Sequence, residues 1–319
     1  MMGDIVPEDH RGRYFGKRNA ILGGVGIVVS LMASFFLDYF KARGIVLIGF
    51  SLLLLIALYA RIISVFMLKN YNDPDGKLNK LHKDFWQFSK NMHKTNYGKF
   101  VIYVTFLNFA AMIASPFFNL YMLQELNLSY VTYTLINLSQ SVSMLIFMLV
   151  WGKFADKYGN KILLIIGNFL IPLLPLLWIF NQNPFYLFIP MFLGGIGWAA
   201  FNLSSSNFVY DLVPHDKRSS YFAYLNVFAG IGIFFGAIFG GFLIKYLNIK
   251  FMNVFLFVFL ISAIARAIVA LAVLPMVKEV RKVEKFSFAK MSPMLHLRAS
   301  GQQTSLNNHS QVGHHALHV

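Results

Sequence analysis

Neutral hydrogen-bonding side chains interrupt several long apolar stretches of this sequence. A polar group in an apolar segment is costly unless it faces a cavity or a partner. Asn108, Ser115 and Asn119 recur at intervals of seven and four residues, so one face of a helix would carry all three. With an aromatic residue and further amides they predict a cavity that binds a neutral, sugar-like or drug-like solute. The candidate residues are Asn108, Ser115, Asn119, Asn137, Gln140, Trp198 and Asn202. For any single residue the alternative is a hydrogen bond between helices, worth about 0.6 kcal/mol.

Titratable chemistry is sparse in the same stretches. The chain has no cysteine, which excludes disulfides, thiol catalysis and cysteine-ligated zinc. No Asp or Glu lies within an apolar stretch, and Asp38 and Glu125 are placed at stretch ends. We therefore find no acid–base or metal cluster for an enzyme and predict no cofactor and no metal site. The histidines near the C-terminus support no metal site either. Carboxylates are the usual proton carriers in coupled transport, so uniport stays open.

The elements that must hold the polar residues are long apolar segments. A membrane-spanning helix needs about 20 mostly apolar residues. Eight segments meet this requirement, and they lack the two-residue alternation of barrel strands. They are Asn19–Phe36, Gly44–Leu68, Phe100–Leu123, Val131–Trp151, Ile162–Phe180, Pro184–Phe201, Tyr221–Ile244 and Phe251–Met276. The prediction is an all-α integral membrane protein whose partner is the lipid bilayer.

The positive charge is distributed unevenly between the two faces. A net charge of +15 is compatible with nucleic-acid binding or with lysine- and arginine-rich cytoplasmic loops. With eight spans, 22 of the Lys and Arg residues fall on one face and four on the other. This split favours membrane topology and disfavours a nucleic-acid partner. It predicts a multi-pass protein of the cell membrane with both termini cytoplasmic.

An internal repeat divides the chain. Residues 4–19 and residues 211–226 align without a gap at an offset of 207, and eight of sixteen positions are identical. Six spans separate the starts of the two copies, so the copies mark equivalent places in two halves of the same orientation. Arg61 and Arg266 lie within spans at an offset of 205. A feature present in both halves favours an architectural role for these arginines over solute binding.

The stretch GKFADKYGNK at residues 152–161 resembles the signature loop of the major facilitator superfamily, G-x-x-x-D-(R/K)-x-G-(R/K)-(R/K). Only Asn160 departs from that pattern. The resemblance implies a parallel duplication of six helices and places the eight spans as family helices five to twelve. It also implies that Asp156 meets Arg218 and the start of the next-to-last span in a latch that closes the cytoplasmic gate. The implied latch set is Gly152, Asp156, Lys157, Gly159, Lys161, Asp211 and Arg218.

The resemblance suggests four parts and a function. We expect a remnant of an N-terminal bundle (1–68), a cytoplasmic linker (69–99), a complete six-helix bundle (100–284) and a disordered tail (285–319). The expected function is secondary transport of a small-molecule solute by alternating access. The chain would then lack the first four family helices, and a separate four-helix portion could be its partner. A non-transporting scaffold or pseudotransporter stays open, and a membrane enzyme is less favoured.

Overall fold

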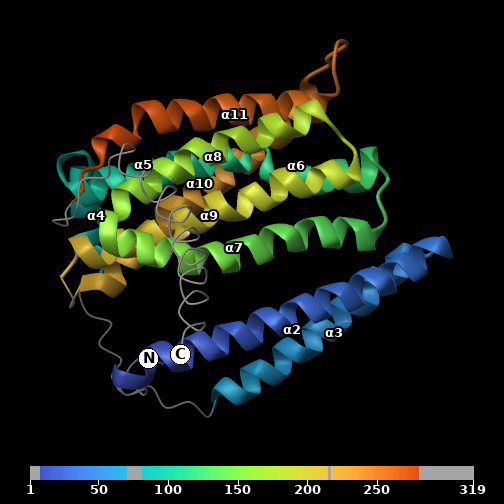
Figure 1. Ribbon diagram of the computed structural model, residues 1–319, viewed down its shortest axis with the longest axis horizontal. Coiled ribbons are helices and arrows are strands. Elements are labelled where there is room, and N and C mark those ends of the chain that lie inside the picture. The colour runs from blue at the N-terminus through green and yellow to red at the C-terminus, as the bar shows by residue number, and fades with distance from the viewer. Residues whose placement is uncertain (1–7, 70–80, 215–216, 280–319) are drawn as a thin grey trace, which may run out of the picture.

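The computed structural model describes residues 8–69, 81–214 and 217–279, and these residues fold into helices (Figure 1). Eight helical segments in this part of the chain are long and apolar enough to cross a membrane, which confirms the predicted all-α fold. The helices are α2 (Glu8–Ala42), α3 (Val46–Lys69), α4 (Leu81–Asn91), α5 (Asn96–Met112), α6 (Ser115–Leu120), α7 (Tyr130–Tyr158), α8 (Asn160–Phe180), α9 (Pro184–Leu212), α10 (Arg218–Tyr246) and α11 (Val254–Ala272).

Helices α5 to α11 form one bundle, and α2 and α3 lie beside it as a pair next to α7 (Figure 1). Within the bundle α7 packs on α9, α8 lies against both α9 and α11, and α5 contacts α10 and α11. The first pair has little of this packing: Leu47 is 78% and Met67 is 76% exposed. Apolar side chains that stay this exposed are compatible with lipid contact.

One predicted span is broken in the middle. The helix that starts at Asn96 ends at Met112, and α6 begins again at Ser115 with a proline in its first turn. Pro116 has no N–H for the carbonyl four residues earlier, so the helix cannot run through this point unchanged. A five-residue π-helical turn, Tyr121–Glu125, completes the span. The break exposes backbone carbonyls inside the bundle, which matters for the cavity described below.

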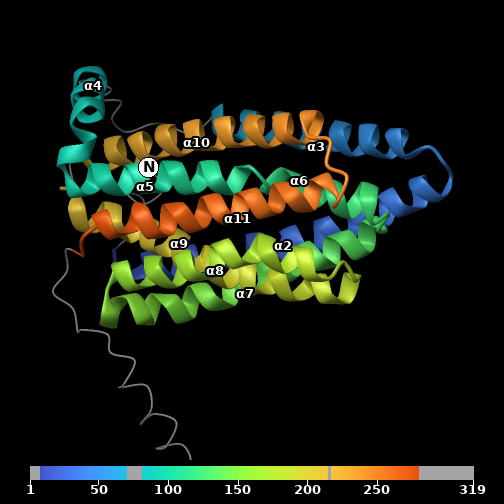
Figure 2. The ribbon, with the colours of Figure 1, turned by 90° about the horizontal axis from the view of Figure 1, so that it is seen from above.

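Several boundaries differ from the predicted ones, and two of the differences concern the signature stretch and the linker. The signature stretch expected as a loop is helical as far as Tyr158, and only Gly159 makes the turn into α8. Gly159 has φ of 88°, a left-handed value that glycine adopts without a steric penalty. The linker predicted at 69–99 contains α4, which stands at the end of the bundle beside the starts of α5 and α10 (Figure 2). Its Phe88 ring stacks on Tyr224 of α10 with centroids 5.3 Å apart.

Three glycines spaced by four residues let α10 approach α5 closely. A Cβ built on Gly232, Gly236 or Gly240 would lie 2.2–2.3 Å from a backbone carbonyl oxygen of α5 or of the break after it. No real side chain tolerates such a contact, so only glycine fits at these positions. This is the small-residue packing that membrane helices use in place of a hydrophobic driving force. We refer to this contact as the glycine seam.

Candidate solute cavity and cytoplasmic contacts

A cavity of about 180 Å³ lies inside the six-helix bundle. Its lining comes from α6, α7, α8, α9 and α11, five elements that are far apart in the sequence. Five of the seven polar and aromatic residues predicted to face a solute line it together: Ser115, Asn119, Asn137, Gln140 and Trp198. The apolar part of the lining includes Trp178, Met191 and Pro190. The arrangement combines aromatic faces with a few hydrogen-bonding groups, as in many small-molecule sites.

The two other predicted residues lie elsewhere. Asn108 and Asn202 are partly buried on α5 and α9 but do not line this cavity. Asn108 donates to the carbonyl of Val104 on its own helix at 2.8 Å. The sequence spacing placed Asn108 on the face of Ser115, but the break between α5 and α6 separates the two turns. A helix periodicity is reliable only along an unbroken helix.

The cavity-lining amides keep part of their hydrogen-bonding capacity. Asn137 donates one N–H to the carbonyl of Tyr133 at 3.0 Å, and Ser115 donates to Ala111 at 2.8 Å. An asparagine side chain has a second N–H and a carbonyl oxygen, so Asn137 can still serve a ligand. The nearby Gly195 lets α9 lie against the backbone of α7, since a Cβ there would be 2.3 Å from the carbonyl oxygen of Gln140.

Arg266 also lines the cavity, although the sequence favoured an architectural role for it. It comes from α11, is 1% exposed, and donates to the carbonyl of Ile171 at 3.1 Å and to that of Ala111 at 3.0 Å. The repeat paired it with Arg61 and favoured an architectural role for both. In the structure Arg61 is exposed on α3, so the two arginines occupy different environments.

The Ile171 carbonyl is available to Arg266 because a proline interrupts the hydrogen bonding of α8. Pro175 lies four residues after Ile171 and has no N–H to donate to it. Ala111 lies at the break between α5 and α6. The guanidinium thus joins α11 to α5 and α8 at their irregular points. This second role is architectural, as the sequence indicated.

At the predicted cytoplasmic end of the bundle, Asn160 joins α8 to α9. Its side-chain amide donates to the carboxylate of Asp211 at 2.7 Å, and its side-chain oxygen accepts from Asn207 at 2.9 Å. Asn160 is fully buried. It is the one residue that departs from the signature pattern, so the basic residue of the pattern is replaced here by a neutral group with its own partners. Glu279 adds a second contact, because its carboxylate accepts from the backbone N–H of Lys161 at 2.7 Å.

The residues of the implied latch gather at this end of the bundle. Gly152, Asp156 and Lys157 lie in the last turns of α7, where Asp156 is exposed. Arg218 donates to the end of α9, to the carbonyls of Val213 at 3.3 Å and Tyr210 at 3.2 Å. The pairing of Asp156 with Arg218 therefore stays a prediction.

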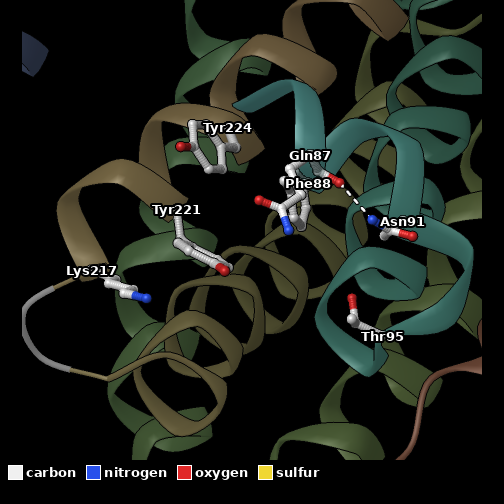
Figure 3. Close-up of a pocket in the computed structure, with 7 residues that line it drawn as sticks. All are labelled: Gln87, Phe88, Asn91, Thr95, Lys217, Tyr221 and Tyr224. Atoms are coloured by element: carbon white, nitrogen blue, oxygen red, sulfur yellow. Dashed lines mark hydrogen bonds between the residues drawn. The ribbon is translucent and has the colours of Figure 1, made fainter. Parts of the chain in front are cut away.

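A second hollow, of about 290 Å³, lies between α4 and the start of α10 (Figure 3). It is lined by Gln87, Phe88, Asn91, Thr95, Lys217, Tyr221 and Tyr224. Asn91 donates to the carbonyl of Gln87 within α4, and Tyr97 donates to the carbonyl of Tyr221 at 2.7 Å. The residues that line this hollow belong to the surface through which α4 contacts α10.

At the other end of the molecule a carboxylate of the first helix pair caps α7. Asp38 of α2 accepts from the backbone N–H groups of Tyr130 at 2.7 Å and Val131 at 2.9 Å. The free N–H groups and the dipole of a helix N-terminus both favour an anion there. Lys41 adds a bond to the carbonyl of Leu128 at 3.2 Å. These contacts tie α2 to the six-helix bundle.

The fold and cavity define an all-helical, multi-pass membrane protein; no group of metal-ligating side chains occurs within residues 8–69, 81–214 and 217–279. Residues 100–306 match the sequence profile of the Major Facilitator Superfamily. The chain belongs to this superfamily, whose members are transporters and not enzymes.

Two relatives give the extent of the similarity. Over 99 residues the chain is 29% identical to the multi-drug resistance efflux pump PmrA homolog of Lactococcus lactis subsp. lactis (strain IL1403). The aligned residues make up 31% of this chain and 24% of that protein. A crystal structure of a mutant of the nucleoside transporter NupG superposes with a TM-score of 0.60 at 22% identity. That match covers 79% of this chain and 66% of the NupG chain. It supports the fold, while the chain spans only part of each relative.

Proposed function

We propose that the chain acts in secondary transport of a small solute across the cell membrane by alternating access, with both termini cytoplasmic. The observation that carries the proposal is the convergence of five predicted residues on one cavity within membrane-spanning helices. Polar side chains at membrane depth are costly and are retained where they face a cavity or a partner. Family membership supports transport as the general activity.

Two sets of contacts would restrict access to the cavity. At the predicted cytoplasmic end, the Asn160–Asp211 bond and the Glu279 cap hold α8, α9 and the segment after α11 together. At the other end, Asp38 holds α2 against the start of α7. Alternating access requires that one set breaks while the other is made. The latch residues Asp156 and Arg218 would belong to the first set.

The absence of cysteine from the sequence allows a direct test. A single Asn119→Cys variant of the full chain, in vesicles of known orientation, is treated with a membrane-impermeant thiol reagent from each side. We expect the cysteine to react from both sides, because the cavity opens alternately. A Leu149→Cys variant is the matched control, since Leu149 is 77% exposed on the apolar surface of α7 and should not meet the aqueous reagent. Reaction from one side only under all conditions would contradict alternating access.

A further inference from the structure

Arg266 carries a charge in the interior of the bundle without an acidic neighbour among the residues that line its cavity. Those residues are Ser, Asn, Gln, Trp, Phe, Leu, Met, Pro and Gly types, all neutral. An ionised group in such a place loses its hydration, and its charge is usually compensated by a partner of opposite sign. Arg266 donates to two carbonyl oxygens, which offer partial charges only.

The guanidinium also has unused hydrogen-bonding capacity. It has five N–H groups, and two of its nitrogens donate to Ile171 and Ala111. The Nε atom is buried and has no hydrogen-bond partner. A buried donor without a partner is unfavourable by about 1–3 kcal/mol. An acceptor that reached Nε would remove this penalty.

The bonds to the two carbonyls hold the guanidinium in place before any ligand arrives. An immobilised arginine loses little further side-chain entropy on binding and suits the planar geometry of oxyanions. Asn119, Asn137 and Gln140 on α6 and α7 add neutral donors to the same cavity, and Trp198 adds an aromatic face. In surroundings of low dielectric constant, one uncompensated positive charge attracts anions strongly.

We propose that Arg266 binds a negatively charged group of the solute, a carboxylate, phosphate or sulfonate, in the cavity between α6, α7, α8, α9 and α11. This inference rests on the proposed transport function and replaces the neutral solute expected from the sequence. The neutral amides and the tryptophan would contact the uncharged part of a small organic anion. The volume of about 180 Å³ fits a small solute.

The test measures the electrostatic preference of the cavity without knowledge of the natural solute. In the Asn119→Cys full chain, the reaction rates with sulfonatoethyl methanethiosulfonate, an anion, and trimethylammonioethyl methanethiosulfonate, a cation, are compared. We expect Arg266→Gln to lower the anion-to-cation rate ratio by about tenfold or more, because the attracting charge is removed. Arg266→Lys should retain most of the ratio, and Arg61→Gln, the exposed arginine at the repeat position, should leave it unchanged.

The outcomes separate this inference from the proposed function. An unchanged ratio in Arg266→Gln, with the cysteine still reactive from both sides, would overturn the anion site alone. A cysteine that neither reagent reaches would overturn the transport cavity and the anion site together. If Arg266→Gln does not fold, the chain with Arg266 intact still decides. In that chain the anion-to-cation rate ratio at Asn119→Cys must exceed the ratio at Asn181→Cys, an exposed position directly after the C-terminal end of α8. An equal ratio would overturn the anion site.

Discussion

The side-chain amide of Asn160 donates to the carboxylate of Asp211 at 2.7 Å and so joins the first residue of α8 to the last turn of α9. Asn160 also accepts from Asn207, so one buried side chain connects two positions of α9. In the signature pattern this position carries a basic residue. Here a neutral amide stands in its place and donates to a carboxylate.

Replacement of Asn160 should destabilise the predicted cytoplasmic end of the bundle. Asn160→Ala removes both bonds and leaves the Asp211 carboxylate without this donor, which should lower the free energy of unfolding by about 1–3 kcal/mol. Asn207→Ala removes only one bond and should have a smaller effect. Thermal unfolding followed by tryptophan fluorescence measures both. Equal losses in the two variants would show that the bond to Asp211 contributes little.

The Asp38 cap should protect the first amides of α7 from hydrogen exchange. Asp38→Asn halves the acceptor capacity of this side chain and removes its charge, so the N–H groups of Tyr130 and Val131 should exchange faster. The matched control is the start of α8, which Glu279 caps in the same way. Its exchange should not change in Asp38→Asn, and Glu279→Gln should show the reverse pattern. Faster exchange at both helix starts would indicate general loosening.

The glycine seam should be intolerant of a single added methyl group. In Gly236→Ala the new Cβ would lie 2.3 Å from the carbonyl oxygen of Phe109, so α10 must move away from α5. We expect a loss of about 1–3 kcal/mol, typical of overpacking. Gly230→Ala is the control on the same helix, because nothing lies within 4 Å of its Cβ and alanine favours the helix. Similar unfolding temperatures for both variants would contradict close packing at the seam.

Pro175 and Arg266 should be coupled in stability. In Pro175→Ala residue 175 has an N–H that can donate to the Ile171 carbonyl within α8. This carbonyl then no longer depends on Arg266 for a donor. Arg266→Gln should therefore destabilise the Pro175→Ala variant less than the unaltered chain. The difference should be on the order of 1 kcal/mol in a double-mutant cycle. Additive effects would mean that the carbonyl is not freed by the proline.

The docking of α4 should depend on its aromatic side chains, of which Phe85 packs against Tyr224 and Phe228 with ring centroids 5.3 and 5.9 Å apart. Phe88 stacks on Tyr224 and lies 5.6 Å from the ring of Tyr221, centroid to centroid. Phe88→Ala should release α4 from α10 and speed tryptic cleavage after Lys90. Trp86→Ala is the control, since Trp86 is 57% exposed. Unchanged cleavage in Phe88→Ala would show that α4 is held by other contacts.

The sequence predicted the eight spans because apolar length is a local property of the chain. It also predicted five of the twelve residues that line the cavity, since polar residues in such spans must face a cavity or a partner. It did not predict α4, because this helix of 11 residues is too short for a span and its aromatic residues find their partners on α10. The partners of Arg266 could not be predicted either, because they are backbone carbonyls, one freed by a proline of α8 and one next to the break after α5. The equivalence of Arg61 and Arg266 was misleading, since a repeat conserves position along the chain and not the neighbours on the other helices.

The glycine seam has a consequence for movement along the helix axis. Its contacts repeat every four residues, at Gly232, Gly236 and Gly240 against carbonyls spaced in the same way. Four helical residues rise about 6 Å. A shift of α10 by one such step returns a glycine to a carbonyl, so the seam sets how near the two axes lie while leaving their relative height to other contacts. Side-chain pairs such as Phe109 and Phe239 then determine which register is occupied. The seam thus allows axial positions of α10 that lie about 6 Å apart.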